Sequence, residues 1–244
     1  MERATGVNQF SEIFRFFSKI FRFEDQEDAQ LTNSTDKKIV NLGQLLVTPM
    51  KYKTEAGKSD PITNGECLST SKIAEKYSFE VLYATDTGKL TTVDSELKTF
   101  KKDGQKYALN YLDHGTILQL DHVKKVVKTI GSENIKLIRL MGCSTNDNAK
   151  ELSKDLEGMP VVGTNQKISL ANGNEVTKYP GLQKTNYIGI LGTSKDQQNF
   201  SNNSQVWGTV NDTKVIFDTQ VNVTEYYNEE EVNTYDLEKA LLNK

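Results

Sequence analysis

The chain has 244 residues, of which 36% are hydrophobic and 26% charged, and its formal net charge is −3. This length can bury a substantial core, and the composition is that of an ordinary globular protein. The lack of a basic excess argues against binding to nucleic acid, and no stretch approaches the roughly 18 consecutive apolar residues of a membrane span. The N-terminus also lacks the basic, apolar and small-residue order of a secretory signal.

Residues 9–23 carry a basic and aromatic amphipathic pattern. Apolar residues recur there at helical spacing, while Arg15, Lys19 and Arg22 share the opposite side. Such a helix could lie on an anionic membrane, bind in the groove of a partner protein, or pack on the core of its own domain. We therefore expect an amphipathic helix within residues 1–24 and leave its target open.

Residues 25–37 are polar and acidic, which is typical of a linker. We expect the globular domain to span residues 38–228 and a C-terminal helix to follow over residues 229–244. In the first half of the domain, apolar runs and turn residues predict strands at 39–47, 78–85, 90–93 and 106–112 and short helices at 69–77 and 95–100. Residues 51–65 are expected to form a polar loop.

The middle of the chain has the clearest periodicity. Residues 120–130 place apolar side chains at helical spacing before Gly131, a natural helix C-cap. A strand is predicted at 135–141, a helix at 144–156 capped by Ser144 or Thr145 and ended by Gly158, and a buried strand at Val161 and Val162. Strands that alternate with helices in this way favour an α/β fold with a mostly parallel sheet.

The pattern becomes rich in hairpins after Gly163. Asn172-Gly173-Asn174 stands between two alternating segments, which predicts a tight hairpin. A short strand is expected at 187–191, and Asn211-Asp212 separates two further strands, at 205–210 and 213–218.

Two reactive residues follow consecutive predicted strands. His114 precedes Gly115 after the strand at 106–112, and Cys143 follows Gly142 after the strand at 135–141. Ligands and reactive groups gather at the carboxyl ends of parallel strands, and consecutive strands are usually neighbours. We therefore expect the imidazole and the thiol to lie within reach of each other.

This pairing favours nucleophilic catalysis. A cysteine at the mouth of a helix feels the partial positive charge of the N-terminus, which favours the thiolate, and a nearby histidine can protonate a leaving amine. Gly115 allows close approach of a carbonyl group, so its N–H and that of Cys143 could form an oxyanion hole. Taken singly, each residue is more often structural: a strand-end cysteine is usually core. We interpret Cys67, His122 and Trp207 as incidental, surface and core residues, respectively.

Four stretches in succession resemble the caspase-related (clan CD) cysteine peptidases, and most of all the self-cleaving cysteine protease domains of large bacterial toxins: YSFEVLYAT, KYALNYLDHG, IKLIRLMGCST and PVVGTNQKISLANGNEV. The resemblance covers roughly residues 78 to 180. It implies a caspase-like sheet, a Cys143 nucleophile, a His114 acid/base and a β-hairpin flap that begins at about residue 164.

The same resemblance implies an inositol polyphosphate activator bound away from the reactive residues. The lysines available for such a pocket, Lys167, Lys178, Lys184 and Lys214, are scattered along the sequence. It also implies an acidic residue after the first strand that orients the histidine, for which Glu55 and Asp60 are the candidates. Asp113 is less suitable, because its side chain would point away from that of His114 in an extended strand.

Two classes of function follow from these observations. The first is a cysteine endopeptidase that acts on a protein or on itself, in the reducing cytosol or as a secreted bacterial toxin or effector in a host cell. The second is a non-catalytic interaction protein on a caspase-like scaffold, which binds a membrane or partner through residues 9–23. Two cysteines in this length fit a reducing compartment better than a disulfide, and no CxxC or HxxxH spacing predicts a metal site. No GxGxxG or P-loop motif follows a strand, which disfavours a nucleotide-binding enzyme.

Overall fold

The computed structural model describes residues 42–54, 72–101, 104–172, 187–193, 205–210 and 213–242. The chain divides into two compact units, and every described residue belongs to the second, Leu42–Asn243. The expected N-terminal helix and linker lie outside the described residues.

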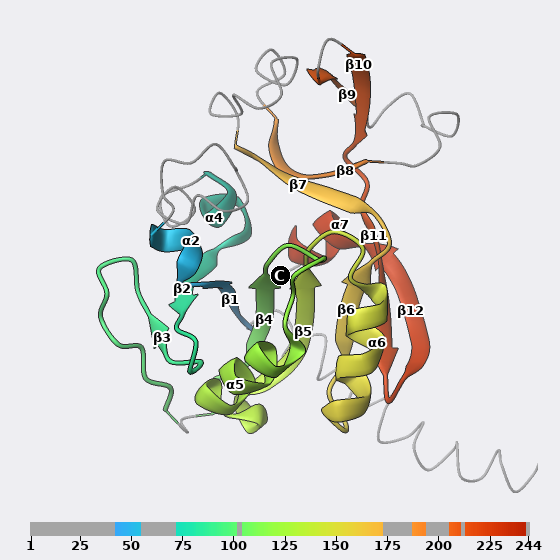
Figure 1. The fold of residues 1–244 in the computed structure, drawn as a ribbon. Helices are drawn as coiled ribbons and strands as arrows, with labels where there is room; N and C mark the ends of the chain where they lie inside the picture. The colour runs from blue at the N-terminus through green and yellow to red at the C-terminus, as the bar shows by residue number, and fades with distance from the viewer. Residues whose placement is uncertain are drawn as a thin grey trace, which may run out of the picture. The chain divides into compact units, whose positions relative to one another are not determined.

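An eight-stranded mixed sheet forms the centre of this unit. Its strands are β1 (Gly43–Pro49), β2 (Phe79–Ala84), β3 (Leu90–Thr91), β4 (Tyr107–Leu112), β5 (Ile135–Met141), β6 (Val161–Thr164), β11 (Asn222–Tyr227) and β12 (Glu230–Asp236). They run in the order β12-β11-β6-β5-β4-β1-β2-β3 (Figure 1). The five central strands pair in parallel; in spatial order they are β6, β5, β4, β1 and β2. The outer strands β3, β11 and β12 pair antiparallel. The prediction of an α/β fold with a mostly parallel sheet is confirmed.

The order of the parallel strands reverses at the centre of the sheet. From β1 the chain moves outward to β2 and β3, then returns to the other side of β1 and moves outward through β4, β5 and β6. In open α/β sheets, ligands often bind at the carboxyl ends of the two strands where the order reverses, here β1 and β4.

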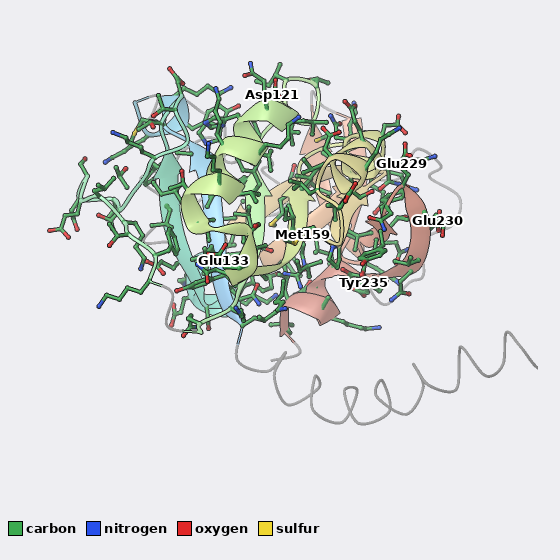
Figure 2. The ribbon with its side chains drawn as sticks, turned by 90° about the horizontal axis from the view of Figure 1, so that it is seen from below. Asp121, Glu133, Met159, Glu229, Glu230 and Tyr235 are labelled. Carbon is green, nitrogen blue, oxygen red and sulfur yellow. The ribbon has the colours of Figure 1, made fainter. Side chains whose placement is uncertain are left out.

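Helices and a second sheet cover the two faces. The helices α5 (Leu120–Ile130) and α6 (Asn146–Asp155) pack on one face, side by side in Figures 1 and 2. The other face packs against α4 (Lys72–Tyr77), α7 (Leu237–Leu242) and apolar residues of two further strands, β7 (Lys167–Asn172) and β8 (Ile188–Thr193). The helix predicted at 120–130 and the strand predicted at 135–141 have the expected bounds, because apolar periodicity and Gly131 agree there.

The second sheet has the order β7-β8-β10-β9 and adds β9 (Gln205–Val210) and β10 (Thr213–Asp218). The hairpin predicted around Asn211-Asp212 is confirmed, since Val210 pairs with Thr213. The tight hairpin predicted at Asn172 is wrong, because Asn172 pairs with Ile188 instead. Packing accounts for the difference, because β8 brings the buried Ile190 opposite the buried Leu170.

Two predicted helices are wrong. Residues 95–100 form no helix; Leu97 bridges to Thr91, and Ser95 has a φ of 67°, which helices do not tolerate. The predicted helix over 229–244 is a strand, β12, as far as Asp236, and only then a helix, α7. Glu230–Thr234 are exposed, so a helix there would bury no apolar face. The segment instead forms a strand, because it can pair with the free edge of β11.

A buried arginine forms the centre of a polar network inside the sheet. Arg139 donates hydrogen bonds through Nη1 to Asn110 Oδ1 (3.1 Å) and Gln44 Oε1 (3.2 Å). Burial lowers the pKa of Arg139, while contact with Tyr235 (labelled in Figure 2) and the charge of Glu225 oppose this effect. Burial likewise raises the pKa of Glu225, which the charge of Arg139 holds down. The arginine therefore satisfies one buried and one half-buried amide, and it compensates a half-buried carboxylate.

We expect Arg139→Met to lower the free energy of unfolding by about 3–5 kcal/mol, because the substitution leaves buried polar groups and Glu225 without their cationic partner. Urea unfolding measures this loss. The exposed Lys136 on the same strand provides the matched control: Lys136→Met should change stability by less than about 0.5 kcal/mol.

The loss in Arg139→Met should also depend on pH. Without the arginine, the pKa of Glu225 rises further above its unfolded value of about 4.3. A carboxyl group whose folded pKa is raised stabilises the fold at low pH, and this contribution disappears as the pH rises through the folded pKa. The difference in stability between Arg139→Met and wild type should thus be larger at pH 8 than at pH 5. Equal differences at both pH values would show that Glu225 does not depend on Arg139.

Candidate active site

The structure brings the two predicted reactive residues to one edge of the sheet. β4 and β5 are adjacent and parallel, and their last paired residues are Leu112 and Met141. His114 and Cys143 each follow two residues later, at the carboxyl ends of these strands. Both side chains are partly exposed.

The loops that carry these residues are in backbone contact. A Cβ atom on Gly115 would lie 1.6 Å from the Cys143 carbonyl oxygen, and one on Gly142 would lie 2.5 Å from the Asp113 carbonyl oxygen. Neither glycine has a φ in the left-handed region. Glycine is needed at both positions because a side chain would not fit there. The His-Gly and Gly-Cys pairs are therefore the means by which the two strand ends meet.

Two amide groups at this contact have no acceptor among the described residues. Among the described residues, neither the Gly115 nor the Cys143 N–H donates to a backbone or side-chain acceptor. The Gly115 nitrogen lies 3.1 Å from a Cβ built on Gly142, and the Cys143 nitrogen lies 3.1 Å from a Cβ built on Gly115. Unpaired amides beside a thiol are the arrangement that an oxyanion requires.

Cys143 stands at a tight turn between β5 and α6. The next residue, Ser144, has a φ of 53°, a strained conformation for a residue with a side chain. Its N–H donates to the Gln166 carbonyl (2.9 Å), and the Cys143 thiol donates to the Ile168 carbonyl at 3.6 Å. The turn therefore presents the thiol at the edge of β7, one turn before the N-terminus of α6.

Thr145 occupies the N-cap position of α6, yet its hydroxyl makes no capping bond. The hydroxyl instead donates to the Leu140 carbonyl (2.9 Å) and accepts from the Thr164 N–H (3.1 Å). The predicted N-cap position is confirmed at Thr145, but its side chain forms no capping bond, because this buried hydroxyl joins β5 to β6.

Asp113 is 3% exposed and its Oδ1 atom collects three contacts. It accepts hydrogen bonds from the Tyr52 hydroxyl (2.5 Å) and from the His114 N–H (2.8 Å), and the Lys51 ammonium lies 3.9 Å away. Lys51 and Tyr52 belong to α2 (Lys51–Thr54), a turn of helix directly after β1 in the segment predicted as a loop. Sequence analysis missed Tyr52, whose only signal was its position just after the first strand.

Four candidate site residues lie outside the described residues: Glu55, Asp60, Lys178 and Lys184. Cys67, which we interpret as incidental, also lies outside them. The side chain of Lys214, on β10, is likewise not described. The orienting acid and the lysine pocket therefore stay predictions.

The interpretation of His122 as a surface residue is wrong. It is 9% exposed, its Nε2–H donates to the Thr85 carbonyl (2.7 Å), and its Nδ1 is hydrogen-bonded to the Tyr111 hydroxyl (2.5 Å). These bonds tie α5 to β4 and to the turn after β2. His122 therefore has a structural role, and His114 is the only histidine at the strand ends.

A scan against protein-family models and searches of curated proteins and of solved structures found no match. Within the described residues, no group of three or more His, Cys, Asp or Glu side chains could hold a metal ion. No helix in that part of the chain is long and apolar enough to cross a membrane.

Proposed function

We propose that the chain is a cysteine endopeptidase in which Cys143 is the nucleophile and His114 the general acid and base. The observation that carries this proposal is the backbone contact between Gly115 and Cys143 at the carboxyl ends of two adjacent parallel strands. The contact joins the only histidine found at these strand ends to a partly exposed thiol at a strained turn.

In the proposed reaction, the Cys143 thiolate attacks the carbonyl carbon of a peptide bond and forms a C–S bond. The Gly115 and Cys143 amides donate to the oxygen that becomes negative. As the C–N bond breaks, the protonated His114 gives its proton to the leaving amine, and the neutral imidazole then removes a proton from the water that hydrolyses the thioester. Hydrolysis restores the thiolate and the protonated imidazole.

Cys143 lies close in the chain to the N-terminus of α6. The helix begins at Asn146, three residues after Cys143, where a helix carries partial positive charge. The resemblance of residues 78 to 180 to self-cleaving toxin domains supports a protein substrate, including the chain itself, and a role as a secreted effector.

Selective modification of the thiol tests the proposal. We expect a peptidyl electrophile directed at cysteine peptidases to label Cys143 and to leave Cys67 unlabelled, as determined by mass spectrometry of tryptic peptides. Labelling should persist in Cys67→Ala and fall at least about 100-fold in His114→Ala, because general acid–base assistance contributes about 10²–10⁴. Equal labelling rates in wild type and His114→Ala would contradict the dyad.

A further inference from the structure

A buried carboxylate beside the dyad takes no part in the proposed reaction. Asp113 is 3% exposed, and a buried charge is costly unless it is paired and hydrogen-bonded. Its contacts run to the backbone of His114 and to two residues of α2, the short helix that follows β1. These contacts therefore hold the backbone of His114 and the residues beside it.

Tyr52 connects this carboxylate to the imidazole. Its hydroxyl donates to Asp113 Oδ1 (2.5 Å), and its ring stands edge-on to the His114 ring at a centroid distance of 6.0 Å and an interplanar angle of 80°. Tyr52 is itself only 4% exposed, so its orientation is fixed by packing and by the carboxylate. One carboxylate oxygen thus holds both the backbone N–H of His114 and the ring that borders its side chain.

We propose that Tyr52 and Asp113 are positioning residues for His114. This inference rests on the proposed peptidase function and adds the elements that orient its acid/base. An orienting acid usually accepts a hydrogen bond from the imidazole directly. Here Asp113 precedes His114 in the chain and acts through the His114 amide and through the aromatic ring of Tyr52.

The charges around Asp113 fit this role. The Lys51 ammonium, 3.9 Å away, offsets the negative charge. Burial, and then the charges of Asp113 and Tyr52, raise the pKa of the neighbouring Tyr111, so Tyr111 stays neutral. Among the described residues, the titratable side chains with a contact or an electrostatic effect that involves Asp113 are therefore Lys51, Tyr52 and Tyr111, and Tyr52 donates a hydrogen bond to it from its hydroxyl.

The test is Tyr52→Phe, which keeps the ring and removes one hydrogen bond. Histidine side-chain NMR provides a direct readout, because the chain has only two histidines. Spectra of His114→Gln assign the signals. We expect Tyr52→Phe to shift the titration curve and ring resonances of His114 and to leave those of the buried His122 unchanged. A general loss of stability would not select His114.

Kinetics provide the second readout. Tyr52→Phe should lower kcat on a cleaved library peptide by about 10-fold to 100-fold with little change in KM, because the acid/base is displaced rather than the substrate. Asp113→Ala should have the same effect, and Asp113→Asn, whose Oδ1 still accepts both hydrogen bonds, should recover most of the loss. The exposed Tyr227, at the end of β11, provides the control Tyr227→Phe.

The two proposals fail separately. If Tyr52→Phe and Asp113→Ala both keep wild-type His114 resonances, the positioning role is wrong, whatever the chain cleaves. If either variant fails to fold, the other variant and Asp113→Asn decide the question in the same spectra. If Tyr52→Phe shifts the His114 resonances as expected but the wild type shows no thiol labelling at Cys143, the positioning geometry stands and the peptidase function is wrong.

Discussion

Cys143→Ala is expected to abolish cleavage of a peptide library and of the chain itself while leaving the fold intact. Loss of the nucleophile should reduce turnover by about a thousandfold or more, as removal of a nucleophile does in other peptidases. The structural cost is small, because the partly exposed thiol makes one weak hydrogen bond, to the Ile168 carbonyl at 3.6 Å. Mass spectrometry of the peptide products and thermal unfolding measure the two effects.

Two variants serve as controls for this result. Cys67→Ala removes the other cysteine and should keep wild-type cleavage. Cys143→Ser keeps the size and the hydrogen bond of the side chain but is a weaker nucleophile, so it should lose nearly as much activity as alanine. Wild-type turnover in Cys143→Ala would show that the sulfur takes no part in the reaction, and would favour a non-catalytic role.

The placement of His114 and Cys143 at one edge could be predicted from the sequence. Two apolar runs with a clear helical segment between them dictate adjacent parallel strands, and both residues follow directly at the strand ends. Their glycines mark a close approach of two backbones, and the 1.6 Å overlap at Gly115 shows how close it is. The prediction from local pattern holds in the folded chain, because the hydrogen bonds between β4 and β5 fix the relative positions of the two strand ends.

The positioning residues could not be predicted, because they depend on where β4 ends. In a strand that continued past Leu112, the side chain of Asp113 would point to the face opposite that of His114. β4 instead ends at Leu112, and the Asp113 side chain turns back to accept the N–H of His114. Its partner Tyr52 is 61 residues away in the chain, and only the reversal of strand order between β1 and β4 brings the two together.

The C-terminal segment shows the limit of periodicity. Val232, Tyr235, Leu237 and Leu241 suggested one helix, but Val232 is 53% exposed and belongs to an edge strand. The choice between helix and strand depends on the unpaired edge of β11, which no local pattern in residues 229–236 reveals. Only Leu237 and Leu241, which α7 buries against the sheet, behave as predicted.

Gly115→Ala should be among the most damaging substitutions in the chain, although it adds a single methyl group. The new Cβ would lie 1.6 Å from the Cys143 carbonyl oxygen and 2.7 Å from its carbonyl carbon, and both atoms are backbone, so no side-chain rotation relieves the overlap. The two loops must separate, which should cost about 3 kcal/mol or more of unfolding free energy and move His114 away from the thiol. Thermal unfolding and the rate of Cys143 labelling measure these effects.

Gly104→Ala separates this overlap from the general cost of replacing a glycine. Gly104 has a φ of 88°, but a Cβ there meets nothing within 4 Å. That variant should lose only about 1 kcal/mol, from backbone strain, and keep wild-type labelling of Cys143. If Gly115→Ala proved as stable and as reactive as Gly104→Ala, the backbone contact would not exist in solution. The dyad geometry would then lose the contact on which the proposed function mainly rests.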